Sequence, residues 1–312
     1  MKPPAFVRRI QFTGVLALRT ALHVGSSWGE GSASDSPVIR TPDGAPFIPG
    51  SSFKGAFRST VEKMALTAGL KSCGLLEGNG CIGAQGKEMD AFNKLRRDSN
   101  WSGDRYLAEL DARLCDTCQL FGSQYAASRI FFSDLLPPPE DKLAASMIQV
   151  RDGVAIDRDS EKAVDRLKYD YEVVALAQTF LLNILLELPQ DEEAAQQEQD
   201  AEAGPRPHRY DLALTCLGVS EYVSGFGRIG GKKSRGLGAC DLRSLAIYEL
   251  DLRPDDPVKR AEHLHRYLLG RTPQEKMTPV PDPEAFLNEQ IQTLPIFQEA
   301  RSSGEDHAEK AL

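Results

Sequence analysis

Residues 7–22 read VRRIQFTGVLALRTAL, and this stretch decides the kind of fold. Apolar and polar side chains alternate along it, which predicts a strand with one buried face and one open face. A half-buried strand needs neighbours, and residues 171–188 (YEVVALAQTFLLNILLEL) alternate in the same way and are expected to form one long core strand. The predicted buried face of the first strand carries Ile10, Phe12, Leu16, Leu18 and Leu22.

The segments around these two strands complete an α+β order. Helical spacing of apolar residues marks 51–68 and 208–223, and short strand patterns mark 128–135 and 239–250. The resulting order is strand, helix, strand, strand, helix, strand. It predicts a ferredoxin-like (RRM-like) split β-α-β core.

The remaining segments are expected to decorate one domain over residues 1–250. Residues 70–128 show no periodicity and are expected to be an irregular insertion, and Asp43-Gly44 is expected to turn a short hairpin. Beyond the domain, 251–312 is expected to be a charged, helical extension. The predicted decorations of the domain are the insertion 70–128, a protruding thumb hairpin at 136–170 and an acidic loop at 190–207.

Charge is distributed unevenly along the chain. The 312 residues carry a net charge of −8, yet 225–243 hold five bases against one acid. A local basic surface fits a polyanionic ligand. No apolar run approaches the ~20 residues of a membrane helix, the N-terminus shows no signal peptide, and six cysteines are too few for a disulfide scaffold. We therefore expect a cytoplasmic protein.

Two segments are candidates for binding phosphate. In FIPGSSFKG (47–55), the predicted helix start places backbone N–H groups and the helix dipole beside Gly50, Ser51, Ser52 and Lys54. Plain N-capping by Ser51 or Ser52 is the alternative, and both can hold at once. In GFGRIGGKKSRGLG (225–238), glycines allow close approach of a ligand, and the spacing is not that of a nucleotide P-loop. A solvated turn is the alternative there. The bases of this second segment are Arg228, Lys232, Lys233 and Arg235.

Four cysteines form a candidate structural metal site. Cys73, Cys81, Cys115 and Cys118 follow the spacing C-x7-C-x33-C-x2-C. A closed four-thiolate Zn²⁺ site would order an insertion that lacks hydrophobic periodicity. Four unrelated thiols or a redox pair are the alternatives. The other two cysteines lie in helix and strand patterns and are expected in the core.

Several segments together resemble the RAMP superfamily of CRISPR-associated proteins, and most of all the backbone subunit of type III effector complexes that cleaves target RNA. The segments occur in the family's order between about residue 8 and residue 250, and the extension lies beyond them. They are HVGSS and SASDSPVIR within 23–40, FIPGSSFKGAFRS (47–59), CDTCQLFGS (115–123), RIFFSDL (129–135), VRDGVAIDRDSEKAVDRLKYDYEVV (150–174) and GFGRIGGKKSRGLGAC (225–240).

The resemblance implies that Asp35 is the catalytic residue for RNA cleavage. A carboxylate can hold Mg²⁺ or Mn²⁺, or help to remove the proton of the attacking 2′-hydroxyl. Without the resemblance, Asp35 is better explained as a turn residue before Ser36-Pro37. Glu30 and Asp43 are the fallback carboxylates.

The resemblance also implies the RNA contacts. The loop at Gly50 would grip the guide RNA backbone, joined by Arg58, and His23 would lie near the guide or be a packed structural residue. The thumb would displace bases from the guide–target duplex, with Met147 and Ile148 as candidate wedges; a charged surface hairpin is the alternative. Its candidate contacts are Arg151, Arg158, Lys162, Arg166 and Lys168.

The implied protein is a backbone subunit that binds CRISPR guide RNA together with complementary target RNA, further copies of itself in a filament and other type III subunits. It would be an endoribonuclease within the assembled complex. Two alternatives stay open: a non-catalytic structural subunit of such a complex, and an endoribonuclease that processes guide precursors, using His23.

Overall fold

A computed structural model describes residues 6–25, 34–76, 80–98, 103–139, 147–189, 210–253 and 256–300. Its architecture is a mixed α+β arrangement with antiparallel sheets, as the sequence predicts. The candidate Glu30, the acidic loop at 190–207 and residues 301–312 of the predicted extension lie outside the described residues. Within the described ranges, no helix has both the length and the apolar character needed to cross a bilayer.

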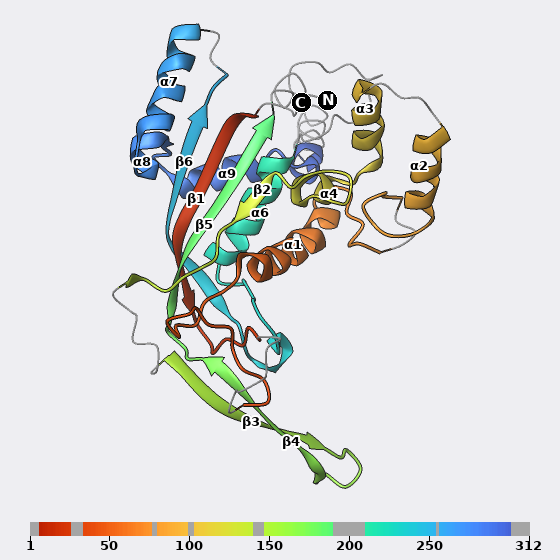
Figure 1. Cartoon of the computed structure of the whole chain (residues 1–312), viewed down its shortest axis with the longest axis vertical. Coiled ribbons are helices and arrows are strands. Elements are labelled where there is room, and N and C mark those ends of the chain that lie inside the picture. The colour runs from red at the N-terminus through yellow and green to blue at the C-terminus, as the bar shows by residue number, and fades with distance from the viewer. Residues whose placement is uncertain are drawn as a thin grey trace, which may run out of the picture.

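A five-stranded antiparallel sheet in the order β2-β5-β1-β6-β7 forms the centre of the molecule (Figure 1). Its middle strand is the one that the opening pattern predicts, with Phe12 directly opposite Ile184 on one side and Ile247 on the other. All three side chains are buried, which confirms the predicted inner face. The strands are β1 (Phe6–Leu18), β2 (Ile130–Phe132), β5 (Thr179–Pro189), β6 (Cys240–Asp251) and β7 (Thr278–Pro279).

Two helices cover the apolar face of this sheet. α1 (Gly50–Thr67) and α6 (Asp211–Val223) share one hydrophobic core with β1, β5 and β6. The ring of Phe57 on α1 stacks on Tyr222 of α6, with centroids 6.0 Å apart. Gly218 allows this approach, because a Cβ there would lie 2.3 Å from Cζ of Phe57. Cys216 and Cys240 are buried in the same core, as predicted.

The segment expected to be an irregular insertion is instead largely helical. It contains α2 (Lys87–Asp98), α3 (Gly103–Arg113) and α4 (Asp116–Phe121). Sequence periodicity misses α2 and α3 because few of their described apolar side chains are buried, such as Phe92 and Leu110, while charged side chains are exposed elsewhere on them. These side chains pack around the four cysteines in a small cluster separate from the main core.

A two-stranded hairpin extends away from the sheet, as Figure 1 shows. It consists of β3 (Ile148–Ile156) and β4 (Ala163–Val174), and we call it the thumb hairpin. The single strand predicted at 171–188 is wrong, because β4 ends at Val174 and a turn with Ala177 at φ +64° precedes β5. Alternation runs through the turn without a glycine or proline, so the pattern hides it.

The C-terminal part is helical with one added strand. α7 (Pro257–Leu269), α8 (Pro273–Lys276) and α9 (Pro283–Ile291) follow β6, and β7 pairs with β6. α9 packs on α6, while Met277 forms a small cluster with Tyr248 and Leu250 of β6. The C-terminal part therefore adds α9 to the main core and β7 to the edge of the sheet.

Candidate functional site

Three segments far apart in the sequence meet at the base of the thumb hairpin, along β4. They are residues 34–40, which we call the Asp35 segment, His23 after β1, and residues 225–238, which we call the basic loop. Alternation along a strand points neighbouring side chains to opposite faces. One face of β4 thus presents Asp170 and Glu172, and the other presents Tyr169 and Tyr171.

The acidic face of β4 holds the Asp35 segment. The backbone N–H of Asp35 donates to Oδ1 of Asp170 at 2.7 Å, and the N–H of Asp170 donates to Oδ2 of Asp35 at 3.0 Å. Asp35 is exposed to solvent. Its carboxylate therefore has a defined position and remains accessible to a ligand.

Glu172 is the second acid on this face and is buried. Its Oε2 accepts from the N–H of Val38 at 3.0 Å, and its Oε1 accepts from Nη2 of Arg40 at 2.8 Å. Its own N–H donates to the carbonyl of Ser36 at 3.0 Å. The two acids together bind the Asp35 segment at both of its ends.

The aromatic face of β4 holds the basic loop. Nζ of Lys232 lies 4.3 Å from the ring centroid of Tyr171 and 5.4 Å from that of Tyr169. Nη1 of Arg235 donates to the hydroxyl of Tyr169 at 3.1 Å. These cation–π and hydrogen-bond contacts fix the loop beside the hairpin. Three cations of the basic loop, Arg228, Lys233 and Arg235, are exposed to solvent.

His23 is a packed residue between β4 and the basic loop, only 7% exposed. Its Nδ1 lies 2.7 Å from the carbonyl of Glu172, and its ring meets Tyr171 edge-on. The carbonyl of His23 accepts from the N–H of Gly231 at 2.8 Å. Gly230 lies so close that a Cβ there would be 2.4 Å from the same carbonyl.

The start of α1 differs from the predicted serine cap. The N-cap is Pro49, whose own side chain makes no capping hydrogen bond, and Ser51 and Ser52 lie exposed in the first turn. The N–H of Gly50 donates instead to Oδ1 of Asp134, which follows β2, at 2.7 Å. Asp134 reaches the helix start because the register of the sheet brings the end of β2 there, which no local pattern indicates.

Two cations of α1 are engaged with the protein itself. Nζ of Lys54 donates to the hydroxyl of Ser128 at 2.9 Å, and burial lowers its pKa, with a further contribution from the nearby charge of Arg58. Arg58 pairs with Glu62 at 2.7 Å, one turn further along the helix. Their predicted RNA contacts stay predictions.

The thumb residues predicted to contact RNA lie mainly on the exposed part of the hairpin. Arg158 and Lys162 lie near its tip, while Arg151 is half-buried and directly opposite Tyr171. Lys168 pairs with Asp152 at 3.3 Å. The side chain of Arg166 lies outside the described residues.

Other sequence predictions are placed as follows. The candidate wedge Met147 is buried at the hairpin base, so it is unsuited to insert between bases. The exposed apolar residues further along β3 are Val150, Val154 and Ile156. Asp43 is exposed in a turn where Gly44 has φ +86° and Arg40 bridges to Pro46, in line with the predicted short hairpin.

The four predicted cysteines come together in a buried group. Their Sγ atoms all lie within 4.8 Å of one another. Sγ of Cys73 is 3.6 Å from Sγ of Cys118, and all four are free thiols. A tetrahedral Zn²⁺ with bonds of ~2.3 Å would hold its sulfurs about 3.8 Å apart. The group can therefore bind a metal ion such as Zn²⁺.

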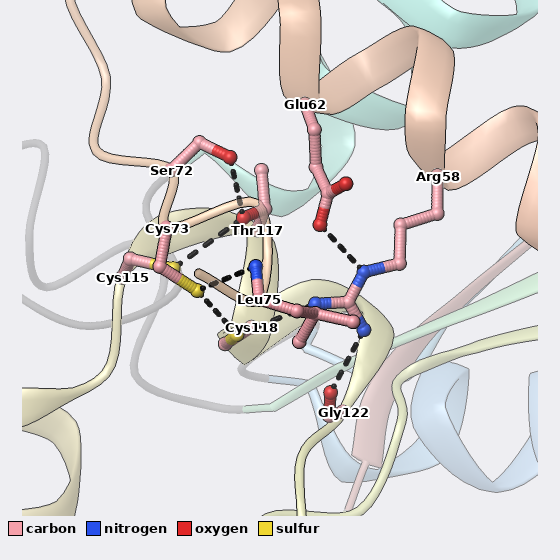
Figure 2. Close-up of polar contacts among 9 residues, drawn as sticks. All are labelled: Arg58, Glu62, Ser72, Cys73, Leu75, Cys115, Thr117, Cys118 and Gly122. Atoms are coloured by element: carbon pink, nitrogen blue, oxygen red, sulfur yellow. Dashed lines mark hydrogen bonds and ion pairs between the residues drawn. The ribbon is translucent and has the colours of Figure 1, made fainter. Parts of the chain in front are cut away.

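N–H donors surround these sulfurs. Backbone N–H groups donate to Cys73 from Leu75 at 3.4 Å and to Cys81 from Gly83 at 3.3 Å. Nη2 of Arg58 donates to Sγ of Cys118 at 3.4 Å, as Figure 2 shows. Donors of this kind stabilise negative charge on sulfur, as a thiolate metal site requires.

The thiols influence one another's protonation. Burial raises the pKa of Cys73 to about 12. Hydrogen bonds with Cys118 and Cys81 lower the pKa of Cys115. Hydrogen bonds of Cys118 with Cys115 and Cys81 raise the pKa of Cys118, because its proton is held by the neighbouring sulfurs. A bound metal would replace the remaining protons.

Sequence reasoning missed Asp134, Asp170 and Glu172. The latter two belong to the run YDYE (169–172), where aromatic and acidic residues alternate. That alternation is a signal for a two-sided strand, although the partners of each side are visible only in the folded chain.

These features define a class of protein: an α+β protein with an exposed acid and a basic loop on opposite faces of one strand, and with a buried cysteine group able to bind metal. The family model of the RAMP superfamily matches residues 15–241. The chain belongs to the RAMP superfamily, and the predicted resemblance is confirmed.

A curated relative adds a shorter similarity. The chain is 45% identical over 60 residues to the CRISPR system Cms endoribonuclease Csm3 of Methanothermobacter thermautotrophicus. The match covers 18% of this chain and 24% of that protein, so it spans about a quarter of the relative's length.

Proposed function

We propose that this chain is a backbone subunit of a type III CRISPR ribonucleoprotein that binds guide RNA and cleaves complementary target RNA. Membership of the RAMP superfamily and the similarity to a protein named as an endoribonuclease support the proposal. The observation that carries it is the exposed Asp35, held at the base of the thumb hairpin on the opposite side of β4 from the basic loop.

The proposed RNA interface is built from cations that recognise backbone and shape. Pairing with the guide would read the target sequence, so the protein needs no base-specific contacts. Several copies would line up along one guide RNA beside other type III subunits in the cytoplasm. The basic loop and the thumb hairpin supply exposed positive charge, with contributions from Lys233, Arg235, Arg158 and Lys162.

We propose that the core is the ferredoxin-like split β-α-β arrangement. The strand order supports it, because β1 lies between β5 and β6, and β5 separates β1 from β2. α1 then connects β1 to β2, and α6 connects β5 to β6, on one face of the sheet. The domain limit near 250 and the role of the hairpin as a thumb belong to the same proposal.

The proposed reaction is an in-line attack by the RNA's own 2′-hydroxyl. That oxygen loses its proton and bonds to phosphorus, while the 5′-oxygen leaves with a proton. The products are a 2′,3′-cyclic phosphate and a 5′-hydroxyl. Asp35 would take up the proton or hold Mg²⁺ or Mn²⁺, which when bound supplies positive charge to the phosphoryl oxygens.

We further propose a structural Zn²⁺ at Cys73, Cys81, Cys115 and Cys118. The S···S distance of 3.6 Å, the burial of all four residues and the N–H donors support it. The metal would hold α2, α3 and α4 together, because the surrounding apolar cluster is small.

The non-catalytic structural subunit is the alternative function. The engagement of Asp35 by the N–H of Asp170 favours it, since the same contact suits a purely structural turn. The burial of His23 gives no support to a precursor-processing enzyme that uses this side chain as an acid or base.

The experiment compares wild type with Asp35→Ala in the guide-loaded assembly. A labelled complementary RNA is incubated with Mg²⁺, and target binding is measured for both proteins. We expect evenly spaced cuts in the wild type only, with equal binding. Tight binding without cuts in either protein would support the structural alternative and contradict the proposed cleavage.

A further inference from the structure

The Asp35 segment has no regular secondary structure of its own beyond short bridges, so its position depends on what binds it. The closest attachment is a reciprocal pair. Each of Asp35 and Asp170 uses its backbone N–H to donate to the other's carboxylate, at 2.7 and 3.0 Å. The pair joins residues 135 positions apart in the chain.

This arrangement orients the carboxylate of Asp35. One oxygen, Oδ2, is fixed by the N–H of Asp170, and the side chain remains exposed. An aspartate on an exposed segment otherwise samples several rotamers. The bond from the Asp170 N–H to Oδ2 selects one of them, and with it the direction in which the other oxygen of Asp35 faces solvent. The Asp170 carboxylate keeps the two groups within reach, because it holds the Asp35 backbone through the Asp35 N–H.

The attachment continues along the segment through Glu172. This acid binds the N–H of Val38 and the guanidinium of Arg40, and the Glu172 N–H binds the carbonyl of Ser36. Asp170 and Glu172 lie two positions apart on one face of β4, so the strand and the segment contact each other over several residues rather than at one point.

We propose that Asp170 is a positioning residue for Asp35, and that the Asp35 segment and the thumb hairpin form one mechanical unit. The inference rests on the proposed cleavage function. Any displacement of the hairpin by a guide–target duplex would then carry Asp35 with it. The cleaving carboxylate is thereby aligned to the RNA by the same element that contacts the RNA.

Two substitutions separate geometry from charge. Asp170→Ala removes the acceptor of the Asp35 N–H, whereas Asp170→Asn keeps an Oδ1 acceptor and loses only the negative charge. Asp152→Ala is the matched control, because Asp152 lies directly opposite Asp170 on the same hairpin face, and its side chain pairs with Lys168 rather than with the Asp35 segment. Asp170→Val, which suits a strand and has no acceptor, replaces the alanine variant if that one does not assemble.

The test measures cleavage rate under single-turnover conditions, target binding, and amide hydrogen exchange of peptides covering 34–40 in the full chain. We expect Asp170→Ala to cleave about 10- to 100-fold more slowly, as for a reacting group misplaced by ~1 Å. Binding stays unchanged, and exchange over 34–40 becomes faster. Asp170→Asn and Asp152→Ala should cleave within about threefold of the wild-type rate, because both variants keep an acceptor for the N–H of Asp35 at position 170.

The outcomes distinguish this inference from the function on which it rests. Wild-type cleavage by Asp170→Ala, together with an inactive Asp35→Ala, overturns the positioning role and leaves the cleavage function standing. A loss in Asp170→Asn as large as in Asp170→Ala shows that charge is required, and also overturns it. Normal cleavage by Asp35→Ala overturns both.

Discussion

Replacing Arg58 with glutamine tests how the cysteine group is stabilised. The guanidinium donates to Sγ of Cys118 at 3.4 Å and to the carbonyl of Gly122 at 3.3 Å, so it links α1 to α4. Glutamine loses the positive charge that faces the thiolates. Groups that hydrogen-bond to metal ligands typically change metal affinity by 10- to 100-fold. We therefore expect Zn²⁺ binding to weaken about 10- to 100-fold, or about 1.4–2.7 kcal/mol.

The assay titrates the metal-free chain, without RNA, in competition with a chromophoric chelator. Two controls isolate the contact with sulfur. Glu62→Gln removes the ion pair of Arg58 and keeps its bond to Cys118. Arg113→Gln breaks a comparable helical pair, in which the side chain of Arg113 bonds to Glu109 at 3.0 Å rather than to a cysteine sulfur. The reasoning is refuted if Arg58→Gln binds Zn²⁺ within twofold of wild type, or if Arg113→Gln weakens binding as much.

Two further predictions concern the buried thiol of Cys73 and the close packing at Gly218. The affinity for Zn²⁺ should rise with pH, by up to about tenfold per pH unit for each proton released. The reason is that the buried thiol of Cys73 has a pKa of about 12 and must lose its proton when the metal binds. A Zn²⁺ affinity that does not change between pH 6 and 8 would contradict this prediction. Gly218→Ala should lower the free energy of unfolding by about 1–3 kcal/mol, since its Cβ would overlap Phe57. Gly55→Ala should raise the free energy of unfolding by about 0.5–1 kcal/mol, because Gly55 of α1 faces open space. Denaturant unfolding measures both, and equal effects of the two substitutions would argue against the packing explanation.

The predictable parts of this protein are those encoded by neighbouring residues. The alternation of 7–22 predicts β1, the spacing of Phe53, Phe57 and Val61 predicts α1, and the C-x2-C pair marks half of the cysteine group. These patterns reflect local periodicity, which a strand or a helix imposes on every few residues. The family resemblance rests on the same kind of short segments.

Local patterns fail where a contact outside the segment decides the structure. The turn at Ala177 interrupts a continuous alternation, and α2 is stabilised around the cysteines despite weak apolar patterning. The cap of α1 comes from Asp134 in place of the adjacent serines, because the sheet carries that acid to the helix start.

The chain's amino-acid order was sufficient for the α+β class, the RAMP resemblance, and the choice of Asp35 and the four cysteines as candidates. The folded structure alone showed that His23 is packed, that Arg58 faces a sulfur, and that Asp170 holds Asp35. The physical reason is separation along the chain. Asp35 and Asp170 are 135 residues apart. The antiparallel bridge between Leu22, which follows β1, and Val174 at the end of β4 helps to bring the backbone N–H of each within hydrogen-bond distance of the other's carboxylate.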